Sequence, residues 1–219
     1  MPKKHKHRCQ HCRQKLDPSV LLGLSDKIIV NSDKMDSFIV PATVSRIEVW
    51  IWGGGGGGVQ GGGGGGSFSR WLLAVNPGRT ITYSAQIGRG GIPMQDGGLT
   101  KLSLSGVNAI AAIEPRGNLI PVPIETVLPA PGGSTAEMNL GGEGGIFALG
   151  VKGQTGINSD FGIGGNGGDG AVNGGFGGKG GAEGQNGGNG QVPGGGGGGG
   201  GIGGSGGTGA DGQIIFRWS

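Results

Sequence analysis

The sequence predicts an all-β protein in which a small β-sheet or sandwich is combined with a polyglycine II helix bundle and preceded by a short N-terminal adapter. Glycine makes up 60 of the 219 residues, which disfavours α-helices because each interior glycine costs roughly 1 kcal/mol relative to alanine. Several short segments alternate apolar and polar residues with the period of two that is typical of strands. Towards the C-terminus, glycine instead recurs with a period of three.

The distribution of glycine divides the chain into two parts. Residues 1–52 contain a single glycine, Gly23, whereas the other 59 lie in the 167 residues that follow. We therefore predict a basic N-terminal adapter at residues 1–36 and a glycine-rich β and polyglycine II domain at residues 37–219. The adapter contains apolar patches at residues 20–24 and 28–30, for which we expect a helical turn or an extended arm.

The predicted strands lie mainly between the adapter and the glycine repeat. The pattern at residues 47–51 places the aliphatic side chains on one face of a sheet and Trp50 and Trp52 on the other. A turn at Asn76, Pro77 and Gly78 predicts a β-hairpin between its two flanking strands, because proline presets one turn angle and glycine supplies a positive φ. The other predicted strands are residues 67–75, 80–87, 100–104, 109–113, 119–127 and 213–218.

Residues 162–212 repeat glycine at two of every three positions. The polyglycine II conformation has three residues per turn and no internal hydrogen bonds, so closely packed rods can bond to each other while the third residue faces outwards. A flexible linker is the alternative, but a linker has no need of a triplet period. Few large apolar residues are available for a core: Ile163, Val172, Phe176, Val192 and Ile202. The predicted outward residues are Asn166, Asp169, Phe176, Lys179, Ser205 and Thr208.

The charge of the chain is unevenly distributed. The first fifteen residues carry six basic residues and no acidic one, so the rest of the chain has a net charge of −3. A basic terminus can contact nucleic acid or an acidic protein surface, but it is more often a solvated tail or an assembly arm, and we do not expect nucleic-acid binding. The apolar stretches are far shorter than the roughly 20 residues that span a bilayer, so no membrane span or secretory signal is expected.

One group of residues in the adapter has metal-ligand chemistry. Cys9 and Cys12 have the spacing at which two thiolates can hold one tetrahedral zinc ion, and we expect His5 and His7 to complete the set. A disulfide between Cys9 and Cys12 and a pair of free thiols are the alternatives. No cysteine or histidine follows Cys12, so a zinc site would have to be local or shared between symmetric copies.

No pattern in the sequence indicates catalysis. All three histidines lie in the adapter, so the glycine-rich part cannot form a Ser-His-Asp or Cys-His arrangement from its own residues. Matches to G-x-G-x-x-G carry no information at this glycine content, and Lys179 is followed by glycine instead of the Ser or Thr of a phosphate-binding loop. We therefore expect that the protein is not an enzyme.

Two segments of the chain resemble those of a known family. They are VWIWGGGGGGVQGGGGGGSFSRWLLAVNPGRTITYSAQIGRGG and, after the triplet glycines, GADGQIIFRW. With this order of features, residues 37–219 resemble the glycine-rich domain of bacteriophage tail fibre and tail-tip proteins. They are more loosely similar to the polyglycine II adhesins that cap the long tail fibres of T-even-like phages. The resemblance implies a virion tail protein, with a domain of β-strands and polyglycine II rods and loops at the distal end that bind the bacterial receptor.

The implied function is that of an adhesin at a tail fibre or baseplate tip, attaching to the host cell surface. Its implied partners are other tail or baseplate proteins, bound through residues 1–36, and a host outer-membrane protein or polysaccharide. Trimeric attachment is common in such assemblies, so a homotrimer is a further expectation. A non-adhesive structural or assembly component of the virion is the alternative. An ice-binding protein is a weaker hypothesis, because Asp169 and Lys179 interrupt the flat face that it would require.

The implied receptor-binding residues lie in the short segments that join the rods. They are shorter and less aromatic than in the adhesins, so the stretch at residues 118–137 is a second candidate contact surface, and ordinary turns are the plain alternative. The candidate receptor-binding residues are Val59, Gln60, Val172, Asn173, Glu183, Gln185, Asn186, Gln191 and Val192.

Overall fold

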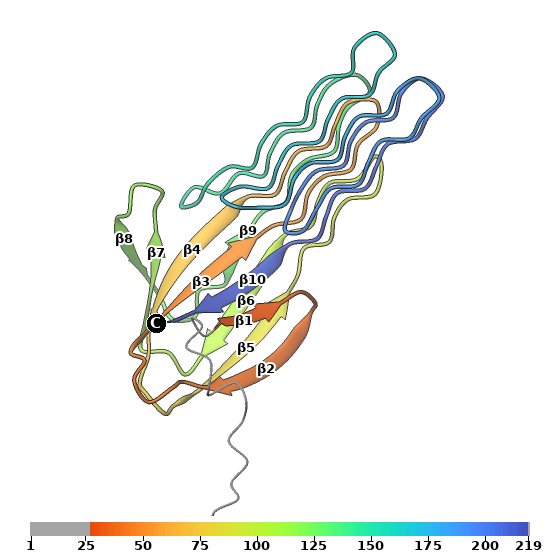
Figure 1. Cartoon of the computed structure of the whole chain (residues 1–219). Coiled ribbons are helices and arrows are strands. Elements are labelled where there is room, and N and C mark those ends of the chain that lie inside the picture. Colours follow the sequence, from red (N-terminus) through yellow and green to blue (C-terminus); the bar gives the residue numbers. More distant parts are fainter. Residues whose placement is uncertain (1–26, 219) are drawn as a thin grey trace, which may run out of the picture.

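The computed structural model describes residues 27–218, and within them it contains ten strands and no helix. The strands form two antiparallel sheets, which confirms the predicted all-β class (Figure 1). The six-stranded sheet has the order β1 (Lys27–Val30), β10 (Gln213–Arg217), β3 (Arg46–Trp52), β4 (Phe68–Ala74), β7 (Ala109–Ile113) and β8 (Leu119–Val122). The four-stranded sheet has the order β2 (Lys34–Ile39), β5 (Thr80–Gln86), β6 (Thr100–Ser105) and β9 (Leu128–Ala130).

The hydrophobic core lies between the two sheets. Alternate residues of each strand point inwards, so β3 contributes aliphatic side chains to the core and turns Glu48 and Trp50 to the other face. Phe216 of β10 contacts Tyr83 of β5 across the core, with ring centroids 5.2 Å apart. Trp52 belongs instead to a second, smaller cluster with Phe68 and Ala171 at the base of the glycine-rich region.

Most predicted strands occur at the predicted positions. The segments at residues 47–51, 67–75, 80–87, 100–104, 109–113 and 213–218 correspond to β3, β4, β5, β6, β7 and β10. The predicted strand at residues 119–127 is shorter than expected: β8 ends at Val122, and a turn precedes β9. Pro123 follows β8 directly, and proline cannot donate the backbone hydrogen bond that a continued strand requires, whereas Pro121 is accommodated in β8 at the edge of the sheet.

The predicted hairpin between residues 67–75 and 80–87 is wrong. The chain does turn at Pro77 and Gly78, where Gly78 has a φ of 73°. However, β4 pairs with β3 and β7 in one sheet, whereas β5 pairs with β2 and β6 in the other. The turn therefore carries the chain from one sheet to the opposite one instead of joining two paired strands.

The sheets begin earlier in the chain than the composition indicated. We expected residues 1–36 to form an adapter, but β1 pairs with β10 through residues 27–30, and β2 starts at Lys34 and pairs with β5. Residues 27–36 are thus part of the β-sandwich. The predicted zinc ligands lie outside the described residues.

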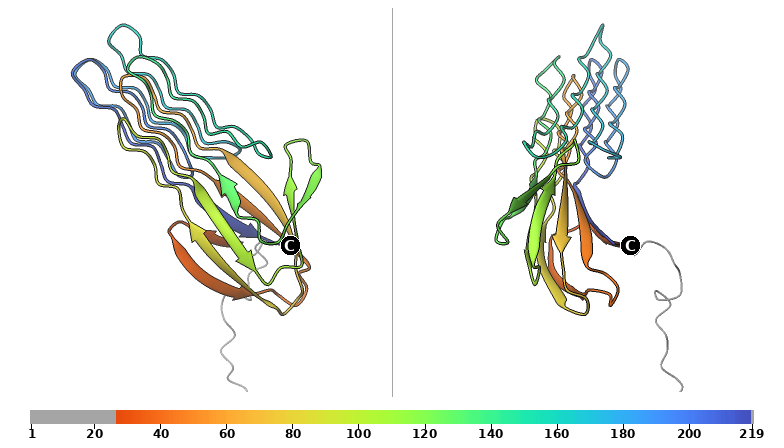
Figure 2. Two further views of the ribbon diagram at one scale, coloured as in Figure 1. Left: turned by 180° about the vertical axis from the view of Figure 1, so that it is seen from behind. Right: turned by 90° about the vertical axis from the view of Figure 1, so that its left-hand side faces the viewer.

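Glycine-rich segments extend from one end of the sheets and run side by side, as the two views in Figure 2 also show. Strands β3, β5 and β9 lead into this bundle, and segments returning from it lead into β4, β6 and β10. The opposite end of the sheets holds the end of β10 and the start of β1, where Arg217 pairs with Lys27.

The backbone hydrogen bonds of the bundle run between segments and change partner with a period of three residues. Within residues 53–58, Gly53 and Gly56 donate to the segment at 64–67, Gly54 and Gly57 to the segment at 95–98, and Gly55 and Gly58 to the segment at 207–210. A segment whose N–H groups return to the same neighbour every third residue has three residues per turn. This rotation matches the period of three in the glycine pattern.

The three uninterrupted glycine runs form the interior of the bundle. Residues 53–58, 61–66 and 194–201 are buried throughout, and each run exchanges hydrogen bonds with six neighbouring segments. A Cβ atom added at any of these glycines would lie within 3.0 Å of a backbone atom of another residue. Interior segments therefore tolerate no side chain, whereas peripheral segments have one free side and carry a non-glycine residue at every third position.

The outward positions are occupied as predicted. Phe176 and Lys179 are exposed, and the polar side chains on the bundle surface also satisfy backbone donors. Asn186 Oδ1 accepts the N–H of Ser205 at 2.9 Å, and Asn189 Oδ1 accepts that of Thr208 at 3.0 Å. Two asparagines three residues apart on one segment thus bond to N–H groups three residues apart on the next segment.

Candidate functional site

The end of the bundle farthest from the sheets, here called the distal tip, consists of the turns where the glycine-rich segments reverse direction (Figure 1). Each distal turn follows a segment that leads away from the sheets and precedes one that returns. The distal tip comprises the turns at residues 59–60, 92–95, 137–140, 160–163, 182–185 and 202–203.

Bulky apolar side chains in left-handed backbone lie at three of these turns. Met94 and Met138 are each 75% exposed, and Phe161 is 97% exposed. All three residues have a positive φ, of 70°, 39° and 43° respectively. This left-handed region is where glycine is favoured, and two other distal turns place Gly184 and Gly203 there. The chain thus carries large exposed side chains at positions where the backbone favours a residue without one.

A hollow of about 290 Å³ lies within the distal tip. Ser159 closes one side by donating its N–H to the carbonyl oxygen of Asn139 at 3.0 Å, and Ile202 donates its N–H to Gly162 at 3.0 Å. These bonds hold the turns at 137–140, 160–163 and 202–203 against each other. The hollow is lined by Gln60, Asn139, Ser159, Asp160, Phe161, Gly162, Ile163, Gly200 and Ile202.

The predicted receptor-binding residues do not form one site. Val59, Gln60, Glu183, Gln185 and Asn186 lie in or beside distal turns. The other four lie in turns at the base of the bundle, next to the sheets, where the indole nitrogen of Trp52 donates to the carbonyl oxygen of Ala171 at 2.8 Å. These basal residues are Val172, Asn173, Gln191 and Val192.

Met94, Met138 and Phe161 are not among the residues predicted from the sequence. Their signal is a bulky apolar residue placed where a glycine-rich segment ends, as in Asp160-Phe161-Gly162. The second candidate surface, residues 118–137, runs along β8, β9 and the segment that leads away from β9, and it reaches the distal tip only at Glu137.

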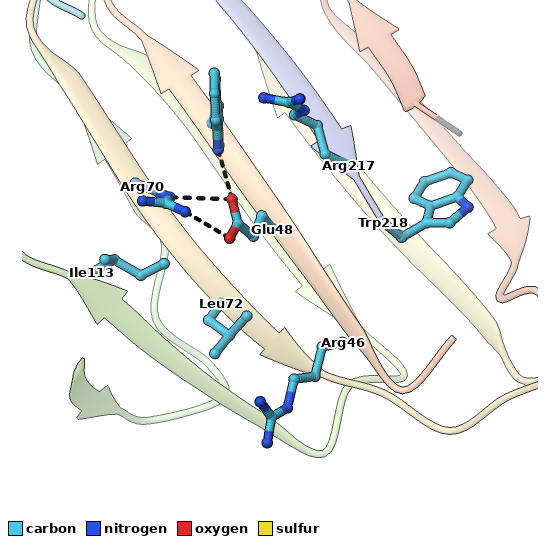
Figure 3. Close-up of a pocket in the computed structure, with 8 residues that line it drawn as sticks. Arg46, Glu48, Arg70, Leu72, Ile113, Arg217 and Trp218 are labelled. Carbon is cyan, nitrogen blue, oxygen red and sulfur yellow. Dashed lines mark hydrogen bonds and ion pairs between the residues drawn. The ribbon is translucent and has the colours of Figure 1, made fainter. Parts of the chain in front are cut away.

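A second surface feature is a groove on the outer face of the six-stranded sheet, here called the sheet groove (Figure 3). Its centre is the ion pair between Arg70 and Glu48: Nη2 of Arg70 lies 2.7 Å from Oε1 of Glu48, and Nε lies 3.1 Å from Oε2. The indole nitrogen of Trp50 also donates to Glu48, at 3.1 Å. The groove has a volume of about 580 Å³ and is lined by Arg46, Glu48, Trp50, Arg70, Leu72, Ile113, Arg217 and Trp218.

The electrostatics of the sheet groove are dominated by arginine. Partial burial raises the pKa of Glu48, but hydrogen bonds from Arg70 and Trp50, together with the charges of Arg70 and Arg217, outweigh that effect and lower the pKa below its ordinary value. The guanidinium of Arg217 lies over the ring of Trp50, 4.2 Å from its centroid. Glu48 is therefore ionised at neutral pH and holds Arg70 in place.

Within residues 27–218, no group of three or more His, Cys, Asp or Glu residues is placed to hold a metal ion. The same part of the chain contains no helix that is long and apolar enough to cross a membrane.

The fold defines an all-β domain in which a bundle of glycine-rich segments extends from one end of a β-sandwich. A family model described as a glycine-rich domain matches residues 31–219, and the chain belongs to this family. The match takes in both the sandwich and the bundle, including residues 31–36. A comparison with curated proteins found no match.

Proposed function

We propose that the chain is a bacteriophage virion tail protein that acts as a receptor-binding adhesin, with the distal tip as its contact surface on the host cell. The observation that carries the proposal is the placement of Met94, Met138 and Phe161, which are exposed at distal turns in left-handed backbone. A non-glycine residue in a sparsely populated backbone region costs of order 1–3 kcal/mol. Large side chains kept at such positions point to a role outside folding.

Apolar side chains at a rigid end are suited to recognition of a surface. Burying a side chain such as Met or Phe contributes roughly 1.5–3 kcal/mol, and a support with few mobile parts loses little conformational entropy when it binds. The hollow beside Phe161 adds polar groups, among them Asn139 and Asp160, that can orient a partner. The support for the proposal is therefore an apolar surface with a small number of polar groups.

We further propose that the glycine-rich segments are polyglycine II rods. The rotation of hydrogen-bond partners every three residues supports this conformation. Six neighbours around each interior run also fit a close-packed bundle of such rods. A bundle closed by backbone bonds needs no hydrophobic core, and this explains how it can project away from the sheets.

The attachment to the virion is proposed for the opposite end of the molecule. Lys27 enters the sandwich beside Arg217, away from the distal tip. We propose that the basic residues before Lys27 contact a tail or baseplate protein, with zinc held by His5, His7, Cys9 and Cys12. Metal analysis of the full-length protein, purified under reducing conditions, tests the zinc site. We expect about one zinc ion per chain, and loss of that zinc in Cys9→Ser. Unmodified protein that contains no zinc would contradict the proposed site.

A cell-binding experiment with matched variants tests the adhesin. Fluorescently labelled full-length protein is added to a panel of bacterial strains that includes hosts of tailed phages. We expect saturable staining of particular strains, loss of that staining in Phe161→Gly, and retention in Phe176→Gly. Phe176 is the matched control because it is also exposed, at 67%, but lies on the flank of the bundle.

The alternative is a non-adhesive structural or assembly component of the virion. The sheet groove is the observation that favours it, because an open groove on the sandwich can receive another virion protein. Absence of staining on every strain, from protein shown to be folded, would refute the adhesin and favour this alternative. Equal staining by Phe161→Gly and the unmodified protein would refute the distal tip as the contact surface.

A further inference from the structure

The sheet groove combines an arginine-rich end with an apolar end. At the first end, Arg46, Arg70 and Arg217 line the groove together with one carboxylate, that of Glu48, which is bonded to Arg70. A neighbouring hollow of about 220 Å³ shares Trp50, Arg70 and Ile113 with the groove, so the two form a continuous surface. The apolar residues that line this second end are Phe68, Ile113, Pro115, Val151 and Val172.

Two of the three arginines have no carboxylate partner among residues 27–218. Arg70 is neutralised by Glu48, whereas Arg46 and Arg217 form no ion pair in that part of the chain. The Arg217 guanidinium lies over the ring of Trp50, and an arginine in such a contact keeps donors available at its edge. An arginine held in this way is suited to bidentate binding of a carboxylate.

The position of the sheet groove indicates what kind of partner it receives. Arg217 lies opposite Lys27, at the end of the sheets away from the distal tip. A macromolecule bound there would leave the tip free. The first fifteen residues of the chain are also basic, with six Lys and Arg and no acidic residue, so both the groove and the segment that precedes the sandwich are complementary to negative charge.

We propose that the sheet groove docks an acidic segment of a partner protein, with carboxylates bound by Arg46 and Arg217 and apolar side chains bound against Ile113, Val151 and Val172. Single-stranded nucleic acid is the competing anion. It is disfavoured because the apolar end of the groove presents aliphatic side chains, among them Val151 and Val172, where a continuous phosphate backbone would require basic groups. The same end suits the apolar side chains of a peptide. This proposal does not depend on the adhesin proposal.

Selection from a random-peptide library tests the docking site. The full-length protein is immobilised, and bound peptides are then measured one by one against variants. We expect enriched peptides that combine Asp or Glu with apolar residues, and affinities that fall about 10-fold or more in Arg217→Gln and in Arg46→Gln, the effect of losing a charge-assisted hydrogen bond. The charge control is Lys101→Gln, on an exposed position of β6 in the other sheet, which we expect to bind as the unmodified protein does.

Folding of the variants is checked separately. Arg46 is exposed and makes no ion pair within residues 27–218, so Arg46→Gln keeps the test valid if Arg217→Gln is destabilised. Failure to enrich acidic peptides, or enrichment of peptides that bind folded Arg46→Gln and Arg217→Gln as tightly as the unmodified protein, would overturn the proposal. The proposal would also be overturned if an oligo-dT strand bound more tightly than the selected peptides and its binding depended on the same two arginines.

Discussion

Gly63→Ala places a methyl group in the centre of the bundle, where the structure has no room for one. Gly63 donates its N–H to the carbonyl oxygen of Gly197 at 2.7 Å and accepts the N–H of Gly168 at 2.9 Å. A Cβ atom at this position would lie within 3.0 Å of backbone atoms of Gly56 and Gly57. Because those atoms are backbone, relief requires that whole segments move apart.

The expected cost follows from the contacts that must change. Overpacking of an interior costs about 1–3 kcal/mol. If the displaced segments also lose the two hydrogen bonds of Gly63, each bond adds about 0.5–1.5 kcal/mol. A loss of roughly 2–6 kcal/mol is a large part of the 5–15 kcal/mol that is typical of a folded protein. At about 2–4 °C per kcal/mol for a domain of this size, the melting temperature should fall by roughly 5–20 °C.

Thermal unfolding followed by circular dichroism measures this effect. The matched control is Ser205→Val, because Ser205 is exposed on a peripheral segment and a surface change is expected to stay within about 0.5 kcal/mol. Gly177→Val tests the same kind of contact in a peripheral segment, where an added Cβ would lie within 3.0 Å of Gly167. If Gly63→Ala melts at the same temperature as Ser205→Val, close packing of the glycine segments is refuted.

Three further variants test the tip, the groove and the bundle surface. Phe161→Gly should raise stability by about 1 kcal/mol, because glycine adopts the φ of 43° without strain; a lower denaturation midpoint would contradict this. Glu48→Gln should cost about 0.5–1 kcal/mol at neutral pH, since the ion pair is partly exposed. The lowered pKa of Glu48 means that its contribution is present above pH 4.5 and lost as the pH falls further, so the unmodified protein and the variant should converge in acid; a constant difference down to low pH would refute the assignment. Asn189→Ala removes the side-chain oxygen that accepts the N–H of Thr208, so amide hydrogen exchange at Thr208 should become faster. Unchanged exchange at Thr208 would show that this bond contributes no protection.

The strands could be predicted because their signal is local. The alternation in β3 identifies both the strand and its buried face, and β7 was predicted at the positions where it occurs. The pairing of β4 and β5 was not predictable from the turn between them, since Pro77 and Gly78 specify only that the chain reverses. Both strands have an apolar face, and these faces contribute to one core between the two sheets.

The bundle could be predicted from its period, but the location of its turns could not. Whether a turn is distal or basal depends on the direction of its segment, which is fixed by hydrogen bonds between residues far apart in the sequence, such as Gly66 and Gly194. For this reason Val172 and Glu183 were grouped together although they lie at opposite ends of the bundle. The uninterrupted glycine runs do carry a readable signal: a run with no third-position residue is an interior segment.

The bundle is held together by backbone hydrogen bonds, in which the apolar side chains exposed at the distal tip take no part. In an ordinary loop, side chains that bind a partner also pack against the domain, so a change in specificity alters folding. Here the segments beneath the tip are held by backbone hydrogen bonds, to which side chains such as Phe161 contribute nothing. Substitutions of such side chains therefore remove none of these hydrogen bonds, so the proposed contact surface can vary while the bonding of the support is kept. The same independence does not extend to the sheet groove, where Glu48 and Arg70 belong to strands of the sandwich itself.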